Sequence, residues 1–220
     1  MKTALAIAFL VCLLLTAGLV APAERAGKVA SGWVTLMPDK NFKGWTRVPI
    51  PPNKPQDPVS QWSIDPLQRF IVCEGNHGHE WLRYDREVQD FEFQVEWRFA
   101  KLDKPAAYNS GIFVRTSADG VVWYQAQIGS RSGGYFFGDN PENDVLKRFN
   151  LSSLVKENRV KEAGEWNTYL IRCQGKTLTL TVNGGLMSQF RECNTPKGFV
   201  GLEAEGYRIE FRNLKIRELR

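Results

Sequence analysis

The chain has 220 residues, with 29 basic and 24 acidic side chains and a formal net charge of +5. This length is enough for one domain with a sizeable core. Because the lysines and arginines are scattered and form no basic stripe, the composition argues against a nucleic-acid-binding protein, and we expect no nucleic acid partner.

The first residues have the pattern of an export signal. Lys2 is followed by the apolar run ALAIAFLVCLLLTAGLV and then by APA at residues 21–23. This pattern is typical of a secretory signal peptide, which we expect to be cleaved after Ala23. An uncleaved membrane anchor is the alternative, because the run is about long enough, at roughly 17–20 residues, to span a bilayer. We predict residues 1–23 as signal peptide, 24–32 as a short tail, and a periplasmic or secreted protein with no membrane contact after cleavage.

Three cysteines follow this signal: Cys73, Cys173 and Cys193. An odd number in an exported chain allows at most one internal bridge, for which Cys173 with Cys193 is a candidate pair. The alternative is that they are buried thiols in strands. No CxxC pair and no acidic loop of the DxDxD type occur, so we predict no required metal and no cofactor.

The region after Trp33 contains no tandem repeat and no linker, so residues 33–220 are expected to form one domain. Residues 47–60, RVPIPPNKPQDPVS, are rich in proline and are predicted to be a loop. His77 and His79 lie between glycines in EGNHGHEW, in a second predicted loop. They could act in acid–base chemistry near pH 7, although exposed loop histidines without a role are common.

The clearest strand is predicted at residues 91–99, FEFQVEWRF, where apolar and polar residues alternate without a break. Residues 167–185 predict two antiparallel strands, with turns at residues 174–176 and 183–185. The last predicted strand, RIEFRNLKIREL, changes its apolar phase between Phe211 and Leu214, which indicates a bulge near Asn213. Residues 140–163 are polar and are predicted to be a short helix or a long surface loop.

Many short strands without a βαβ rhythm predict an all-β fold, an antiparallel β-sandwich or jelly roll. Two of its predicted strands, residues 109–115 and 122–128, carry an unusual set of polar side chains on one face. Amides and a guanidinium hydrogen-bond sugar hydroxyls, and an aromatic ring covers the C–H face of a sugar. If the strands are neighbours, this row forms a saccharide-binding surface; a solvated face is the alternative. The row consists of Asn109, Gly111, Phe113, Arg115, Trp123, Gln125 and Gln127.

Two further sets of carboxylates are candidates for chemistry. Glu203 and Glu205 share a strand face, with carboxyl groups roughly 6–7 Å apart from a rise of about 3.3 Å per residue. That spacing lies in the range of paired glycosidase carboxylates, although solvated pairs are common. Glu92, Gln94 and Glu96 also share a face, which leaves open a retaining glucanase with an ExDxE-like strand whose central Asp is replaced by Gln.

Seven short segments, in order, resemble the 3-keto-disaccharide hydrolase family. They are GWVTLMPDKNFKGW, GHEWLRYDREVQDFEFQVEWRF, NSGIFVR, YQAQI, GEWN, VNG, and GLEAEG with EFRNLKI. The resemblance runs from about Trp33 to the C-terminus and implies a concanavalin A-like sandwich, export and a carbohydrate substrate. Many relatives carry Glu at the position of Gln125 and Asp at that of Ser130. Glu203 replaces a common Gln, and Glu205 matches one frequent family version.

With this resemblance, the site residues predict an exported hydrolase or lyase that acts on glycosides, including those oxidised at C3 of the sugar. A 3-keto group acidifies the C2–H bond, so cleavage can proceed by proton abstraction and elimination, with water added afterwards. We predict that Arg115 stabilises the enolate oxygen and that Glu205 or His79 is the base. A non-catalytic carbohydrate-binding module is the alternative. The predicted substrate-binding residues are Asn109, Trp123, Gln125, Gln127, Glu203 and Tyr135.

Overall fold

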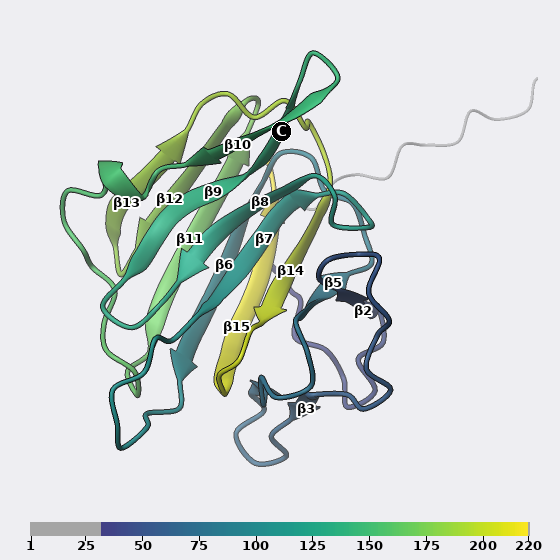
Figure 1. Cartoon of the computed structure of the whole chain (residues 1–220), viewed down its shortest axis with the longest axis vertical. Coiled ribbons are helices and arrows are strands. Elements are labelled where there is room, and N and C mark those ends of the chain that lie inside the picture. Colours follow the sequence, from purple (N-terminus) through teal and green to yellow (C-terminus); the bar gives the residue numbers. More distant parts are fainter. Residues whose placement is uncertain (1–31, 220) are drawn as a thin grey trace, which may run out of the picture.

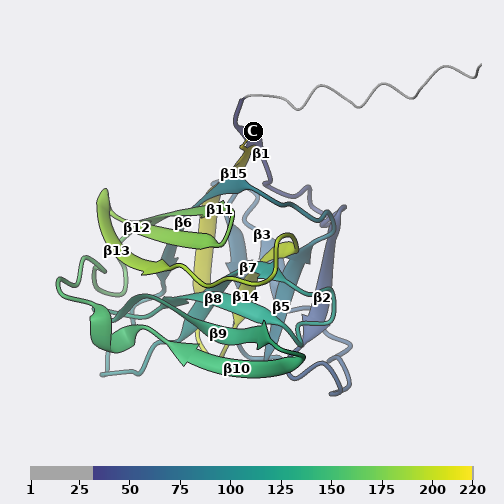
Figure 2. The same cartoon turned by 90° about the horizontal axis from the view of Figure 1, so that it is seen from above.

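The computed structural model describes residues 32–219 (Figure 1). The predicted signal peptide, residues 1–23, lies outside the described residues. Within them the chain folds into two antiparallel sheets that stack face to face, as Figure 2 shows from above. The all-β sandwich predicted from the sequence is therefore confirmed. No helix in this part of the chain is long and apolar enough to cross a bilayer.

The first sheet has eight strands among the described residues. Seven of them follow the spatial order β13-β12-β11-β6-β15-β4-β3, and β1 pairs with β15. Their bounds are β1 (Val34–Thr35), β3 (Trp62–Ile64), β4 (Ile71–Cys73), β6 (Phe91–Phe99), β11 (Asn167–Gln174), β12 (Thr177–Val182), β13 (Gly185–Phe190) and β15 (Ile209–Glu218).

The second sheet has seven strands in the order β10-β9-β8-β7-β14-β5-β2. A short 3₁₀ helix, η1 (Ser152–Leu154), follows β10. The strands are β2 (Trp45–Pro49), β5 (Glu80–Tyr84), β7 (Ser110–Thr116), β8 (Trp123–Ile128), β9 (Gly133–Glu142), β10 (Val145–Asn150) and β14 (Phe199–Ala204).

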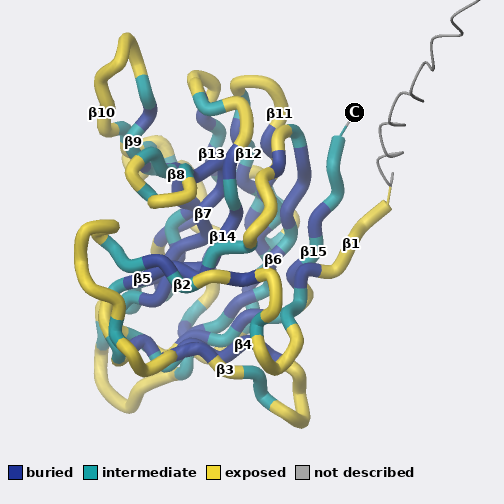
Figure 3. The backbone as a smooth tube through the Cα atoms, turned by 90° about the vertical axis from the view of Figure 1, so that its right-hand side faces the viewer, coloured by how far each residue is buried: buried dark blue, intermediate teal, exposed yellow. Residues whose placement is uncertain are grey.

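The hydrophobic core fills the space between the sheets. The alternation in β6 directs Phe93, Val95 and Trp97 inward, and they join one buried cluster with Ile112 and Val114 of β7. Figure 3 shows that burial follows the strands, while the loops at their ends are exposed. Because the core takes one face of the second sheet, every other residue of β7, β8 and β14 is left for its outer face.

Three local predictions are confirmed. The strand predicted at residues 91–99 is β6, and turns join β11 to β12 and β12 to β13 where expected. In β15 the register shifts between Arg212 and Lys215, and Asn213 has a φ of 52°. That bulge turns the strand so that Phe211 and Leu214 both reach the core, which explains the change of apolar phase.

Two local predictions are wrong in part. Residues 140–163 contain the strand β10, which pairs with β9 at the edge of the second sheet. Most of its side chains are exposed on both faces, so its sequence carries no alternation to reveal a strand. The proline-rich loop begins later than predicted, because residues 47–49 belong to β2. Cys73, Cys173 and Cys193 are buried free thiols, so the candidate disulfide is absent among the described residues. Cys73 and Cys173 lie in strands as the alternative reading expected, whereas Cys193 lies in the loop after β13.

Candidate functional site

A cavity of about 250 Å³ opens on the outer face of the second sheet. One end of it is polar, and we call this end the polar ring: His79, Asn109, Gln125, Gln127, Glu203 and Glu205. The other end is apolar, and we call it the apolar end: Trp81, Phe113, Trp123 and Phe137, with Thr116 and Gly120 beside them. Pro49, Ile50 and Pro52 also line the cavity, on the side where the Ile50 N–H donates to the His79 carbonyl.

Strand pairing explains why the polar residues meet. β7 and β8 are antiparallel neighbours, with Gly111 opposite Gln127 and Phe113 opposite Gln125. On the other side of β7, β14 brings Glu203 opposite Trp81 of β5. The predicted pairing of residues 109–115 with 122–128 is therefore confirmed, and their polar side chains share one sheet surface.

Hydrogen bonds connect the amides of the polar ring to its carboxylates. Gln127 donates from Nε2 to Asn109 Oδ1 (2.6 Å), and Asn109 donates from Nδ2 to Glu205 Oε2 (2.6 Å). Gln125 donates from Nε2 to Glu203 Oε2 (2.7 Å). The amides thus hold both carboxylates in fixed orientations.

His79 joins the two carboxylates. Its Nε2 lies 2.9 Å from Glu203 Oε1 and 4.0 Å from Glu205 Oε2. It stands directly before β5, so its side chain extends from the loop over the end of the sheet. Glu203 is almost completely buried, whereas about a third of the side chains of His79 and Glu205 is exposed. An imidazole and two carboxylates therefore converge at an accessible point, the minimum needed for acid–base catalysis.

The surroundings shift the protonation of two of these groups in the same direction. Burial raises the pKa of Glu203 above its ordinary value, and the charge of Glu205 adds to this, while hydrogen bonds from His79 and Gln125 oppose it. Partial burial alone would lower the pKa of His79, but the hydrogen bond and charge of Glu203, with the charge of Glu205, outweigh it and raise that pKa. The pair of His79 and Glu203 therefore retains a proton to higher pH than isolated side chains would.

The same three residues could hold a cation. His79, Glu203 and Glu205 each offer one ligand atom, and these atoms lie within 4.8 Å of one another. One imidazole nitrogen and two carboxylate oxygens suit Zn²⁺ or Mn²⁺. Binding would require His79 and Glu203 to exchange their mutual hydrogen bond for bonds to the ion, so the two states exclude each other.

Arg115 does not line the cavity, contrary to the role predicted for it. Opposite Phe199 and Gly201 of β14, β7 has one extra residue between Phe113 and Thr116. This bulge gives Arg115 a φ of 46° and moves Thr116 to the cavity face. The guanidinium is fully buried and donates to the carbonyls of Gln89, Gly175 and Thr195 and to Asp90 Oδ1 (2.8 Å). Its position indicates a structural residue that ties three loops together.

Two other positions that the sequence singled out also lie apart from the cavity lining. Tyr135 is on the same strand as Phe137, with ring centroids 6.1 Å apart, but Phe137 is the one that lines the cavity. Ser130 accepts a backbone hydrogen bond from Ala163, so the absence of a carboxylate there does not alter the cavity. Asn109, Trp123, Gln125, Gln127, Glu203, Glu205 and His79 all line the cavity as predicted.

The glucanase reading is wrong, because its carboxylates lie on the other sheet. Glu92 pairs with Arg172 and Arg217, and Glu96 pairs with Arg212. These ion pairs cover the outer face of the first sheet, on the opposite side of the core from the cavity.

Sequence reasoning missed most of the apolar end. Trp81 and Phe113 form a small buried cluster of their own with Val48, on the outer face of the second sheet. A signal for Trp81 was present, because it stands two residues after His79 and alternation places both on one face. Phe137 and Ile50 carried no such signal, since their contribution depends on which strands become neighbours.

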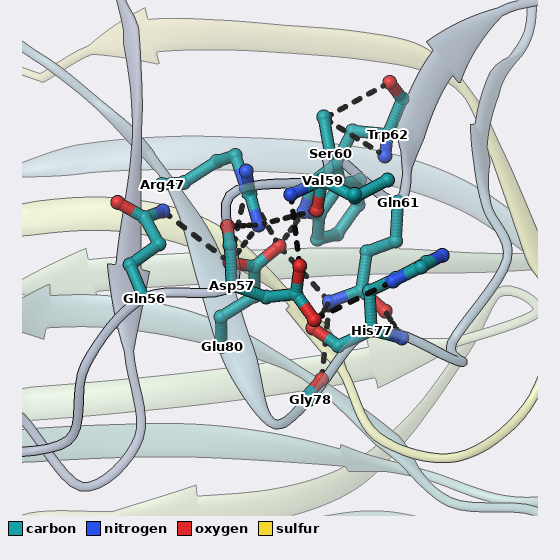
Figure 4. A network of polar contacts seen from close by, with 10 residues as sticks. All are labelled: Arg47, Gln56, Asp57, Val59, Ser60, Gln61, Trp62, His77, Gly78 and Glu80. Carbon is teal, nitrogen blue, oxygen red and sulfur yellow. Dashed lines mark hydrogen bonds and ion pairs between the residues drawn. The ribbon is translucent and has the colours of Figure 1, made fainter.

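The buried carboxylate of Glu80 fixes the position of the loop after β2, which forms one wall of the cavity. Glu80 accepts hydrogen bonds from Arg47 Nε (2.9 and 3.0 Å), Gln61 Nε2 (2.9 Å) and Trp62 Nε1 (2.9 Å) (Figure 4). Arg47 also donates to the carbonyls of Asp57 and Val59. This network holds residues 56–62 of the loop against β5, directly beside His79.

Comparison with known proteins agrees with the fold. A candidate glycosyl hydrolase from Parabacteroides distasonis aligns over 86% of this chain and 100% of its own, with 18% identity and a TM-score of 0.59. A Bacillus subtilis carbohydrate-binding module, CBM66, aligns over 80% and 96%, with 14% identity and a TM-score of 0.57. A Bacillus licheniformis β-glucanase aligns over 86% and 98%, with 15% identity and a TM-score of 0.53. At these identities the similarity shows a fold of carbohydrate-active proteins.

No curated protein sequence matches the chain. The model of one family does, over residues 32–217, which include every strand described above except the last residue of β15. The chain belongs to the family of 3-keto-alpha-glucoside-1,2-lyase-like domains.

Proposed function

We propose that this chain is an exported enzyme that cleaves glycosides oxidised at C3 by elimination across C1 and C2. One observation carries the proposal: His79 lies 2.9 Å from Glu203 and 4.0 Å from Glu205, in a cavity lined by amide and aromatic side chains. An acid and a base at this spacing suit the removal of one proton and the delivery of another.

Glu205 is the better placed base. It is partly exposed to the cavity, and Asn109 orients it, whereas Glu203 is buried behind His79. The Glu205 carboxylate takes the proton from C2, which the neighbouring ketone acidifies. The electron pair of the C2–H bond forms an enolate with the C3 ketone, and the enolate then collapses to the C1=C2 double bond as the C1–O bond breaks. The products are an alcohol and a sugar enone, to which water adds in a later step.

We assign to His79 the role that the sequence suggested for Arg115, the stabilisation of the enolate oxygen. An enolate formed beside two carboxylates requires a positive charge nearby, and no lysine or arginine of the described chain lines the cavity. Since the carboxylates raise the pKa of His79, its imidazolium form persists to higher pH. The imidazolium offsets the negative charge and gives a proton to the departing oxygen, which balances the proton taken by Glu205. Gln125 and Gln127 position the hydroxyls.

Sugar release from paired substrates tests the proposal. The mature protein is incubated with disaccharides and with their 3-keto derivatives, and we expect release from the keto forms only. Glu205→Gln should lower kcat by about 10²–10⁴-fold, the usual contribution of a general base. Glu96→Gln, on the other sheet, is the matched control and should keep full activity. Release from ordinary disaccharides, or full activity of Glu205→Gln, would refute this mechanism.

A carbohydrate-binding module is the second candidate, and the polar ring itself favours it. Both carboxylates already accept hydrogen bonds from amides, an arrangement suited to rigid recognition of hydroxyls as much as to proton transfer. The fold is also that of the Bacillus subtilis module. Saturable binding of saccharides by calorimetry, with no product from any keto-sugar, would establish this function instead.

A further inference from the structure

The apolar end of the cavity has no use in the chemistry described so far. It lies toward the Thr116 end of β7, whereas Asn109 marks the polar end of the same strand. Trp81 and Phe113 form its buried floor, and the partly exposed Trp123 and Phe137 complete it. The cavity is therefore apolar around Phe113 and Trp123 and polar around Asn109 and Glu205, and the two parts meet where Phe137 pairs with Gln125 and Trp81 with Glu203.

A second sugar unit is a poor occupant for the apolar end, because the side-chain polar groups of Trp123 and Thr116 are already engaged. The indole Nε1 of Trp123 donates to Asp139 Oδ2 (2.9 Å). The hydroxyl of Thr116 donates to the Val114 carbonyl (3.3 Å). Sugar hydroxyls placed there would lose several bonds to water and find one side-chain donor, the indole N–H of Trp81, in exchange, which disfavours binding.

The rings at the apolar end have the arrangement that aromatic groups prefer among themselves. Trp81 meets Phe113 at an interplanar angle of 60° with centroids 5.3 Å apart, and Trp123 meets Phe137 at 89° and 5.0 Å. Edge-to-face contacts of this kind leave ring faces and edges available for one more aromatic group.

The partly exposed indole ring of Trp123 is also held in place in the absence of a ligand. Arg148 lies over the ring of Trp123, 5.0 Å from its centroid, and forms an ion pair with the Asp139 carboxylate that accepts the indole N–H. A ring that is already fixed loses little conformational freedom on binding, so contact with it contributes more to affinity.

We propose that the apolar end binds an aromatic aglycone, so that the substrates are aryl glycosides whose sugar occupies the polar ring. The inference rests on the proposed function for the orientation of the sugar, with C1 directed toward the apolar end. Trp81 and Phe113 form the floor on which the aromatic group packs. Trp123 and Phe137 are then the residues that determine specificity.

Ligands that cannot be cleaved test this inference without the influence of leaving-group ability. Phenyl and methyl C-glycosides of 3-keto-glucose, as α and β anomers, are titrated into the mature protein by calorimetry. We expect the phenyl compound to bind about tenfold more tightly or better in one anomeric series. Phe137→Leu, which keeps an apolar side chain but removes the ring, should reduce this preference several-fold. Trp33→Ala, an exposed aromatic residue far from the cavity on β1's side of the first sheet, is the control and should not change it.

Cleavage of methyl 3-keto-glucoside separates this inference from the proposed function. If that substrate is cleaved while phenyl and methyl C-glycosides bind equally, or if neither binds, the aromatic subsite is refuted. If the phenyl compound binds preferentially and no keto-glycoside is cleaved, the enzyme proposal fails, and the apolar end still binds the aromatic group of a recognised glycoside.

Discussion

The side chain of Gln125 lies across the bare backbone of Gly111. A Cβ atom on Gly111 would come within 2.1 Å of Gln125 Nε2 and 2.3 Å of its Cδ. By crossing β7 at this point, the amide of a residue on β8 reaches Glu203 on β14, two strands away. The glycine of NSGIFVR is therefore required by a neighbouring side chain rather than by an unusual backbone angle.

Gly111→Ala should displace Gln125 and release Glu203 from its amide partner. We expect the fold to survive, because the added methyl meets a side chain rather than backbone, and we expect ligand affinity to fall about tenfold or more, since Glu203 loses a charge-assisted hydrogen bond. Calorimetric titration with a saccharide ligand measures the effect. Gly32→Ala, where nothing lies within 4 Å of the added atom, is the matched control. Equal affinities of the two variants would contradict the role given to Gln125.

The stability of the protein should decrease as pH rises through the neutral range. The pKa values of both Glu203 and His79 are raised, so the folded protein holds protons more tightly than the unfolded chain does. The unfolding free energy should then fall from above the ordinary glutamate pKa of 4.5 until the pH passes the raised pKa of His79, above 6.5. Urea denaturation across this range measures the slope. Glu203→Gln should flatten it and Glu96→Gln should not; a slope unaffected by Glu203→Gln would rule out this origin.

Arg115 should matter for folding rather than for activity. Arg115→Met leaves several carbonyl groups and Asp90 without their buried donor, and removal of one partner of a buried pair costs about 3–5 kcal/mol of unfolding free energy. Arg208→Ala removes an exposed partner of Glu74 and should cost no more than about 1 kcal/mol. Urea denaturation gives both values. Loss of activity in a fully folded Arg115→Met variant would instead support the catalytic role that the sequence predicted for Arg115.

Activity on 3-keto-glycosides should survive removal of divalent cations. The proposed mechanism takes its positive charge from His79, whose Nε2 hydrogen-bonds to Glu203. Initial rates are compared before and after treatment with a chelator, with the metal content of the protein measured in parallel. Activity that is lost with the metal and restored by Mn²⁺ or Zn²⁺ would show that His79, Glu203 and Glu205 act as ligands, and the source of positive charge would have to be reassigned.

The sequence predicted the sandwich and much of the polar ring because both depend on alternation within strands. A period of two places Gln125 with Gln127, and Glu203 with Glu205, on one face whatever the register between strands. The outer face of β7 and β8 is fixed once the apolar residues of the same strands enter the core. Seven of the nine predicted site residues therefore line the cavity.

The failures occur where alternation breaks or is absent. A single extra residue in β7 turns Arg115 away from the face that counting assigns to it, and no local signal reveals a bulge whose cause is the partner strand. The edge strand β10 is exposed on both faces and shows no period at all. The apolar end depends on contacts between β2, β5, β8 and β9, which only the strand order determines.

The position of Glu80 beside His79 has a consequence for altering this protein. One residue of β5 anchors the loop that walls the cavity, and the residue before it extends into the polar ring. Hydrogen bonds to Arg47 and Glu80 hold residues 56–62, and β2 holds the chain up to Pro49. The segment 50–55, which contains Ile50 and Pro52, lies between these two fixed points and can be replaced by other sequences. Libraries confined to this segment would vary the apolar side of the cavity next to His79 while Glu80 keeps the adjoining strand in place.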